Sequence, residues 1–215
     1  MSNKDKNAKC RLLIIGDSKV GKTSFLSMYT KGNFNINYLA TIGVELFKKE
    51  EKINNEVIHI ELWDTAGSEK FNSLTAGFFG KAEGIMVMFD VTCQESFDNI
   101  RNWAESIKTH LNNDLDRNLV IIIGNKIDCI NEREIKTEEA KKYSKELGFE
   151  YFETSAKTGQ NVNDTIKYLA KEVMKKKNKI FQNSYNSNIN RNINDKNGYV
   201  IDKRQNEKEG CCIII

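Results

Sequence analysis

The stretch that decides the fold is Gly-Asp-Ser-Lys-Val-Gly-Lys-Thr at residues 16–23, directly after the apolar run Leu-Leu-Ile-Ile at residues 12–15. A Gly-x-x-x-x-Gly-Lys-Thr sequence between a strand and a helix is typical of a phosphate-binding loop. Its backbone amides can face phosphate oxygens, and the positive end of the following helix favours anions. The sequence therefore predicts a nucleotide site in which Lys22 reaches the β- and γ-phosphates and Thr23 offers its hydroxyl to Mg²⁺.

The composition limits the class of protein. A chain of 215 residues is long enough for one buried domain and a tail, and its net charge of +3 argues against a nucleic-acid partner. The five cysteines do not form a disulfide framework, since two of them are adjacent near the end of the chain. No signal peptide or run of about eighteen apolar residues is found, so we expect a cytosolic protein unless an anchor is attached.

The alternation of short apolar runs with amphipathic stretches predicts repeated βα units. The expected fold is therefore a three-layer α/β domain around a mainly parallel six-stranded sheet, spanning residues 1–178. A further strand at 41–53 is separated from the next by little more than Asn54-Asn55, which predicts an antiparallel hairpin at the sheet edge. The other predicted strands are 11–15, 57–63, 84–90, 119–124 and 149–153, and the predicted helices are 22–31, 95–111, 137–147 and 162–176.

The base of the nucleotide is indicated by Asn-Lys-Ile-Asp at residues 125–128, where a predicted strand ends. The Asp128 carboxylate can accept hydrogen bonds from guanine N1–H and the exocyclic amine, a pairing that adenine does not offer. Asn125 and Lys126 then have positioning and stacking roles, and the Ala156 N–H can face guanine O6. Alone, this motif would be a common polar turn. At the carboxyl end of a strand in a sheet that carries a phosphate loop, it favours a guanine site and argues against an ATP-using kinase.

Five motifs occur in the order found in the Rab family of Ras-like small GTPases, which the chain resembles from about residue 9 to 177 and at its C-terminus. They are GDSKVGKTS (16–24), TIGVE (41–45), WDTAG (63–67), GNKID (124–128) and ETSAK (153–157). The resemblance implies a Ras-like P-loop NTPase fold, GTP and GDP as ligands and Mg²⁺ as the metal. It also implies that the chain hydrolyses GTP to GDP and phosphate as a switch in vesicle trafficking.

The resemblance also implies roles for individual residues. Thr41 would bind Mg²⁺ and meet the γ-phosphate, Asp64 would hold Mg²⁺ through water, and the Gly67 amide would touch the γ-phosphate. Phe34 would either pack against the base or serve as a core contact. The metal set is thus Thr23, Thr41 and Asp64. The expected nucleotide-binding residues are Ser18, Lys19, Val20, Gly21, Lys22, Thr23, Ser24, Phe34, Tyr38, Thr41, Gly67, Asn125, Lys126, Asp128, Ser155, Ala156 and Lys157.

An effector surface is implied as well. In the family, an exposed hydrophobic triad corresponds to Leu46, Trp63 and Phe78, with an aromatic residue usual at the first position. Phe47 follows Leu46 and should point to the opposite face of the strand. The alternative is that Leu46 and Trp63 only pack at the edge strand. The whole expected surface is Ile42, Gly43, Val44, Leu46, Trp63 and Phe78.

Two residues depart from the family pattern. The expected catalytic residues are Ser68, Lys22 and Thr41. Most Rab proteins have Gln where this chain has Ser68, and that Gln orients the attacking water. We therefore expect unaided hydrolysis of GTP to be slow. A Rab-type activating protein can supply Gln and Arg in trans, an effect of up to roughly 10⁵-fold in related GTPases. The alternative is a hydrolysis-deficient, GTP-bound recruitment module.

Lys19 stands where the family usually has a small residue. Its side chain is either a cation near the phosphates or a solvated side chain that points outward.

The C-terminal sequence Gly-Cys-Cys-Ile-Ile-Ile at 210–215 resembles a double-geranylgeranylation site at Cys211 and Cys212, and its last four residues also fit a C-a-a-X box. Two lipid chains give stable anchoring, whereas one gives marginal anchoring. Residues 179–215, rich in Asn and charge, are expected to be a disordered tail. The resemblance implies a monomer on the cytoplasmic face of an endomembrane that cycles through the cytosol. The implied partners are an exchange factor, a GTPase-activating protein, a GDP-dissociation inhibitor, a Rab escort protein and effectors.

Overall fold

The computed structural model describes residues 8–35, 41–67, 77–111, 119–180 and 182. The chain divides into two compact units, residues 1–173 and 174–215. The expected domain boundary at residue 178 stays a prediction. Four of the expected site residues lie outside the described residues, namely Tyr38, Ser68, Cys211 and Cys212.

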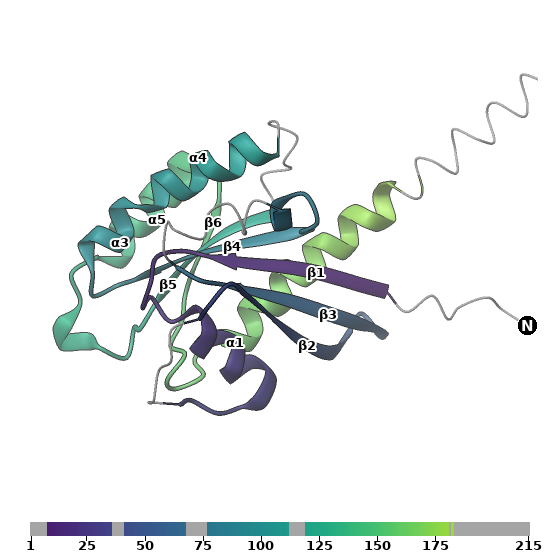
Figure 1. The fold of residues 1–215 in the computed structure, drawn as a ribbon, viewed down its shortest axis with the longest axis horizontal. Coiled ribbons are helices and arrows are strands. Elements are labelled where there is room, and N and C mark those ends of the chain that lie inside the picture. Colours follow the sequence, from purple (N-terminus) through teal and green to yellow (C-terminus); the bar gives the residue numbers. More distant parts are fainter. Residues whose placement is uncertain (1–7, 36–40, 68–76, 112–118, 181, 183–215) are drawn as a thin grey trace, which may run out of the picture. The chain divides into compact units, whose positions relative to one another are not determined.

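The first unit is built on a six-stranded sheet with the order β2-β3-β1-β4-β5-β6 (Figure 1). All neighbouring strands are parallel except β2 and β3, which are antiparallel and place β2 at the edge. This arrangement confirms the predicted fold class and the predicted edge hairpin. The strands are β1 (Ala8–Ile15), β2 (Val44–Ile53), β3 (Glu56–Thr65), β4 (Gly84–Asp90), β5 (Val120–Asn125) and β6 (Glu150–Glu153).

The hairpin turn follows from its two asparagines. Asn54 and Asn55 both have positive φ, 51° and 67°, which matches the two-residue turn whose twist suits antiparallel strands. Asparagine tolerates this left-handed conformation better than most side chains do. The turn sets the register in which Leu46 lies opposite Trp63.

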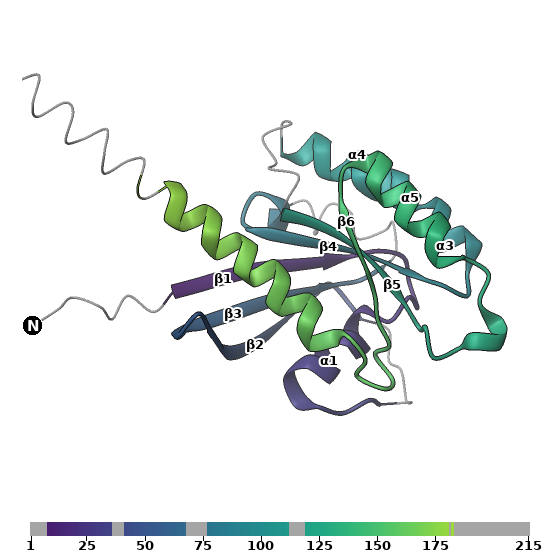
Figure 2. The same cartoon turned by 180° about the vertical axis from the view of Figure 1, so that it is seen from behind.

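Helices cover both faces of the sheet, giving three layers (Figures 1 and 2). One face packs against α3, α4 and α5, and the other against α1 and residues 162–173 of the last helix. The helices are α1 (Lys22–Lys31), α3 (Gln94–Asp98), α4 (Ile100–His110), α5 (Thr137–Leu147) and 162–180, with a short 3₁₀ helix at Ile130–Glu132. Among the described residues, no helix is both long enough and apolar enough to cross a membrane.

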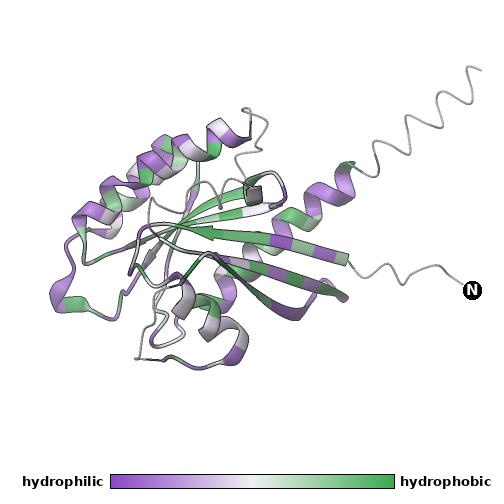
Figure 3. Cartoon of the chain, in the orientation of Figure 1, coloured by the Kyte–Doolittle hydropathy of each residue, from purple (hydrophilic) through white to green (hydrophobic). Residues whose placement is uncertain are grey.

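The core lies between these layers. Figure 3 shows apolar residues concentrated on the central strands β1 and β4, as expected for strands covered on both faces. Every residue of β4 and of β5 is buried. Leu13 and Ile15 of β1 join the cluster under α3 and α4, so the loop that follows β1 starts from a rigid base.

The helix predicted at 95–111 is two helices, α3 and α4, that meet at Asn99. The backbone N–H of Asn99 still donates to the Glu95 carbonyl at 3.0 Å. Its side chain, however, is drawn toward the phosphate loop, where Nδ2 donates to Asp17 Oδ2 at 2.7 Å. This long-range contact accompanies the break in the helix and was invisible to helical periodicity.

Candidate functional site

The phosphate loop, residues 16–23, connects β1 to α1 at the carboxyl edge of the sheet. Gly21 has φ 101°, and a Cβ placed there would lie 2.4 Å from Asn125 Nδ2. A larger residue would therefore both strain the backbone and displace Asn125. The glycine spacing of the motif reflects close packing of the loop against the neighbouring strand end.

Lys22 is the first residue of α1, and its side chain is buried. Its Nζ donates to the carbonyl oxygens of Gly16 at 2.8 Å and Asp17 at 2.7 Å. Burial lowers the pKa of Lys22 to about 8, although the nearby Asp64 and Asp17 carboxylates act in the opposite direction. The loop thus encloses a cationic group at the start of a helix, a combination that attracts phosphate.

Thr23, Thr41 and Asp64 come together beside Lys22 from three separate segments. Thr23 Oγ1 donates to Asp64 Oδ2 at 2.5 Å, and the Thr41 hydroxyl lies 2.7 Å from that of Thr23 and 3.3 Å from the same carboxylate oxygen. Asp64 is fully buried, and its Oδ1 has no hydrogen-bond partner among the residues that the structure describes. Burial raises the pKa of Asp64 in the free protein.

This set of oxygens fits a magnesium ion. Carboxylate and hydroxyl oxygens are hard ligands of the kind that Mg²⁺ takes, usually alongside waters and substrate phosphates. A buried carboxylate oxygen without a partner is costly unless a cation or donor compensates it. No group of three or more His, Cys, Asp or Glu that could hold a metal occurs in the described part of the chain. The site therefore relies on one carboxylate and two hydroxyls.

A pocket of about 360 Å³, which we call the smaller pocket, opens next to the phosphate loop. Phe34 forms part of its wall and is 37% exposed, so it is not a core contact. The smaller pocket brings together most of the residues expected to bind the base. Its lining is Lys19, Gly21, Ser24, Phe34, Asn35, Asn125, Lys126, Asp128, Cys129, Ala156 and Lys157.

Asn125 joins three segments behind this pocket. Its Nδ2 donates to the Val20 carbonyl at 2.9 Å, and its Oδ1 accepts from Thr154 Oγ1 and from the Ala156 N–H, both at 3.1 Å. The Ala156 N–H expected to face guanine is thus directed to Asn125 in this structure. Asn125 is 1% exposed and links the phosphate loop to β5 and to the loop after β6.

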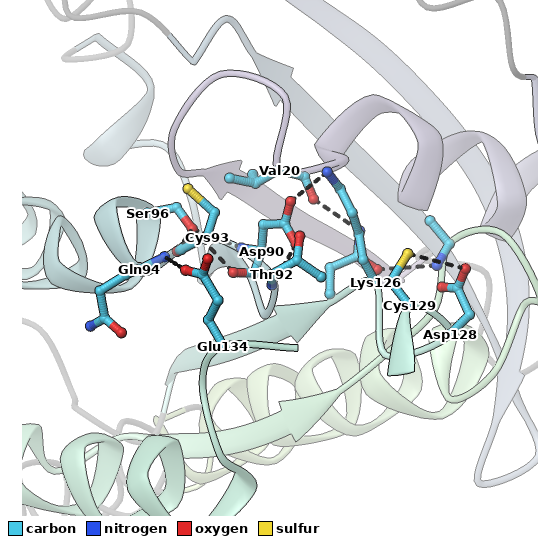
Figure 4. A network of polar contacts seen from close by, with 12 residues as sticks. Val20, Asp90, Thr92, Cys93, Gln94, Ser96, Lys126, Asp128, Cys129 and Glu134 are labelled. Carbon is cyan, nitrogen blue, oxygen red and sulfur yellow. Dashed lines mark hydrogen bonds and ion pairs between the residues drawn. The ribbon is translucent and has the colours of Figure 1, made fainter. Parts of the chain in front are cut away.

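Asp128 and Lys126 are each held by a protein partner. Ser155 Oγ donates to Asp128 Oδ1 at 2.6 Å, and the Lys157 ammonium lies 3.9 Å from Oδ2. Figure 4 shows Lys126 reaching back to Asp90, with an Nζ to Oδ2 distance of 2.5 Å. The backbone of Lys126 has φ 68°, which turns its side chain out of the strand direction. Ser155 thereby orients the carboxylate, and Asp90 fixes the lysine stem.

A second space, the larger cavity of about 730 Å³, lies between the phosphate loop and helices α3 and α4. Asp17 is anchored on this side, because its carboxylate accepts from Asn99 Nδ2 at 2.7 Å and from Trp103 Nε1 at 2.8 Å. Of the expected nucleotide residues, the lining includes Ser18, Lys19, Val20, Gly67 and Lys126.

Sequence reasoning missed several of these contacts. Asp90 ends β4 directly beside Asn125 in the sheet register, so the rule that sites form at the carboxyl ends of parallel strands could have found it. Asn99 and Trp103 carry no such signal, because they lie on a helix more than eighty residues from Asp17.

The expected effector residues differ in exposure. Ile42 is 86% exposed and Leu46 47%, while Phe47 is buried on the opposite face, as the alternation of the strand predicts. Gly43 accepts a hydrogen bond from the Ala66 N–H at 3.0 Å, next to Val44 at the start of β2.

The expectation that Leu46, Trp63 and Phe78 form an exposed triad is wrong for Trp63, and Phe78 is only partly exposed. Trp63 is only 9% exposed and belongs to the core, and Phe78 is partly buried against that core. The reason is direct packing, because the Phe78 ring meets the Trp63 ring edge to face at 5.1 Å. Leu46, at 47%, is the most exposed of the three.

Comparison with known proteins agrees with this geometry. The model of the Ras family matches residues 11–175. Rab-27B of Rattus norvegicus is 35% identical over 222 residues, which cover 99% of this chain and all of that protein. Rab-27B of Homo sapiens is 39% identical over 82% of this chain and 84% of that protein, and human Rab-8B is 36% identical over 87% and 83%. With the phosphate loop, the oxygen cluster and the adjacent pocket in place, this chain belongs to the Ras family, as a small GTPase related to the Rab proteins.

Proposed function

We propose that this chain is a Rab-like switch that alternates between GTP and GDP and acts in vesicle trafficking on a membrane. The observation that carries the proposal is the convergence of Lys22, Thr23, Thr41 and Asp64 at the phosphate loop, next to a pocket lined by Asp128. A cation, a set of hard oxygen ligands and a carboxylate for the base are the three features that a guanine nucleotide with Mg²⁺ requires.

The smaller pocket would hold the base. Asp128 would accept from guanine N1–H and its amine, in the orientation that Ser155 imposes. Lys126 and Phe34 would flank the ring from the pocket walls. The Ala156 N–H, which donates to Asn125 Oδ1 at 3.1 Å in this structure, would turn to guanine O6 when the base binds. Lys157 and Ser24 would complete the rim, and Gly21 and Val20 would present backbone amides to the phosphates.

Thr23, Thr41 and Asp64 would hold the magnesium ion, which supplies charge neutralisation for the phosphates when bound. Lys22 would balance the remaining phosphate charge from inside the loop. Thr41 belongs to a segment that precedes β2, and Gly67 follows β3, so loss of the γ-phosphate would release two segments of the effector face. Tyr38 would join the nucleotide contacts from the first of these segments.

Ser68 replaces the glutamine that orients water in most Rab proteins, and we propose that unaided hydrolysis is slow for this reason. A GTPase-activating protein would then set the rate. Ile42, Gly43, Val44 and Leu46 would form the accessible part of the effector surface, with Trp63 and Phe78 supporting it from beneath.

Geranylgeranyl groups on Cys211 and Cys212 would anchor the chain to an endomembrane, with residues 179–215 as the tether. The trafficking role and the remaining partners follow from the likeness to Rab proteins. These partners are an exchange factor, a GDP-dissociation inhibitor and a Rab escort protein.

The first test concerns base selectivity. Binding of GDP and ADP to the full chain would be compared for the wild type and for Asp128→Ala. We expect binding of GDP only, and a loss of GDP affinity of about 10²-fold or more in the variant, because the ring donors lose a charged acceptor. Equal binding of ADP would contradict the proposal.

The second test concerns hydrolysis. Single-turnover GTP hydrolysis would be measured for the full chain and for Ser68→Gln, each with and without a Rab-type activating protein. A slow wild type that the activator brings to the level of the variant supports an ordinary switch. A wild type that stays slow with activators that work on the variant supports a GTP-bound recruitment module instead.

A further inference from the structure

Lys19 has a backbone conformation that lysine rarely adopts. Its φ of 67° places it in the left-handed region, which is common for glycine and disfavoured for residues with a Cβ. Such outliers persist where the surroundings hold them, and they cluster at functional sites. A glycine or asparagine would meet the demands of the turn, so the choice of lysine calls for a reason other than loop geometry.

The position of Lys19 is also distinctive, because it lines both the smaller pocket and the larger cavity. Its side chain therefore borders both the pocket expected to hold the base and the space between the phosphate loop and helices α3 and α4. Lys126 is the other lysine that borders both spaces. Lys19 is exposed, so its ammonium can reach a ligand without displacing a packed side chain.

The three lysines around the phosphate loop differ in their partners. Lys22 donates to two loop carbonyls and Lys126 pairs with Asp90. Lys19 forms no ion pair or hydrogen bond with any residue that the structure describes. Among these three lysines it is therefore the one whose charge no described residue compensates.

The carboxylates close to Lys19 are mostly engaged elsewhere. Asp17 accepts from Asn99 and Trp103, Asp90 from Lys126 and Thr92, and Asp128 from Ser155. Glu95 is the exception in the lining of the larger cavity, since its exposed carboxylate has no partner among the described residues. The Lys19 ammonium could therefore pair with Glu95 instead of with a bound phosphate, and the experiment has to distinguish these two partners.

We propose that Lys19 is a second phosphate clamp, whose ammonium binds phosphate oxygens of the nucleotide from the exposed side of the loop and slows nucleotide release. The inference rests on the proposed function, since the ligand is a guanosine di- or triphosphate. Lys22 holds the phosphates from the buried side, and Lys19 closes the open side. A phosphate contact explains why a lysine occupies this strained position and why its charge has no partner among the described residues.

The test is the rate of GDP release from the full chain, measured for the wild type, Lys19→Gln and Lys19→Gly. The glutamine keeps the strained backbone and most of the stem, whereas the glycine removes both, so agreement between them assigns the effect to the charge. We expect release to be about tenfold faster in both variants at low salt, because a charge-assisted hydrogen bond is lost. At about 0.5 M salt the difference should shrink to roughly twofold, since the lysine is exposed and therefore screened.

Three controls make the result specific. Lys142→Gln removes an exposed lysine on the outer face of α5 and should leave release unchanged. Glu95→Gln should also leave it unchanged if the phosphates are the partner. Guanosine, which lacks phosphates, should bind the wild type and Lys19→Gln equally well.

Each contrary outcome overturns the clamp in a recognisable way. Unchanged release in Lys19→Gln, or an effect that does not depend on salt, excludes a phosphate contact. Equal weakening of guanosine binding would show a distorted pocket, and an equal effect of Glu95→Gln would show that Lys19 acts through that carboxylate. If the wild type fails to prefer GDP over ADP, the proposed function falls and the clamp falls with it. Normal GDP binding with unchanged release overturns the clamp alone.

Discussion

Removing the Asn125 side chain offers the sharpest test of how the site is assembled. In Asn125→Ala, the Val20 carbonyl, the Thr154 hydroxyl and the Ala156 N–H all lose their shared partner. All three residues are buried, at 1%, 0% and 3% exposure. A buried group left without a partner costs about 1–3 kcal/mol, and some of the three can be reached by water from the smaller pocket. We therefore expect a loss of unfolding free energy of about 2–4 kcal/mol.

Urea unfolding of the full chain would measure this loss of unfolding free energy. It would be done once with a metal chelator and no nucleotide, and once with saturating GDP. The loss should be larger with GDP, because the variant also loosens the loop that holds the phosphates. Asn33→Ala is the matched control, since Asn33 is exposed and accepts only a 3.4 Å bond from Ser27. Its change should stay below about 0.5 kcal/mol. A loss below about 1 kcal/mol in Asn125→Ala with unchanged GDP affinity would refute the idea that this side chain joins the three segments.

Three further predictions follow from the same geometry. A Cβ at Gly67 would lie 2.3 Å from the Ser18 nitrogen, so Gly67→Ala should lose about 1–3 kcal/mol of unfolding free energy in urea. Gly77→Ala serves as the matched control, because no atom of the described residues lies within 4 Å of its added Cβ. Burial sets the pKa of Lys22 at about 8 in the free protein, and phosphate binding needs the charged form. The dissociation constant for GDP, measured in a chelator, should therefore rise about fourfold between pH 7 and 8.5, and a constant value would contradict this role. Cys129 lines the smaller pocket, so bound GDP should slow its alkylation, as peptide mass spectrometry would show; equal rates would place the ligand elsewhere.

The alkylation experiment has an internal reference. Cys10 lies in strand β1, is fully buried, and should resist alkylation with or without GDP. Burial and the neighbouring Asp128 raise the pKa of the Cys129 thiol, so its reaction is slow at neutral pH and should be followed at a mildly alkaline one. Labelling of Cys10 during the assay would indicate unfolding and would invalidate the comparison.

Sequence reasoning located the elements well where the signal is local. The phosphate loop and α1 are contiguous in the chain, and α1 begins at Lys22 as predicted. The edge hairpin followed from two asparagines between two strands. Strand ends were predicted less accurately. The strand predicted at 57–63 runs from Glu56 to Thr65, because a strand extends as far as a neighbouring strand offers hydrogen bonds.

Contacts between distant segments were beyond sequence reasoning. Trp63 was expected on the surface, but it is buried in the core, where it contacts the Phe78 ring from fifteen positions further along the chain. The pairing of Lys126 with Asp90 and of Asp17 with Trp103 likewise depends on which helix packs beside the loop. No periodicity in the chain reports such contacts, because they arise only when strands and helices pack.

By itself, the sequence determined the fold class, the phosphate loop and the order of the motifs, since each depends on residues that are neighbours in the chain or repeat with a regular period. Only the tertiary structure decided which side chains have partners. It brought Thr23, Thr41 and Asp64 into one cluster. Within the described part of the chain, it left Asp64 Oδ1 and the Lys19 ammonium without partners. The physical reason is that burial and hydrogen bonding depend on distance in space, and the packing of the sheet against its helices sets that distance.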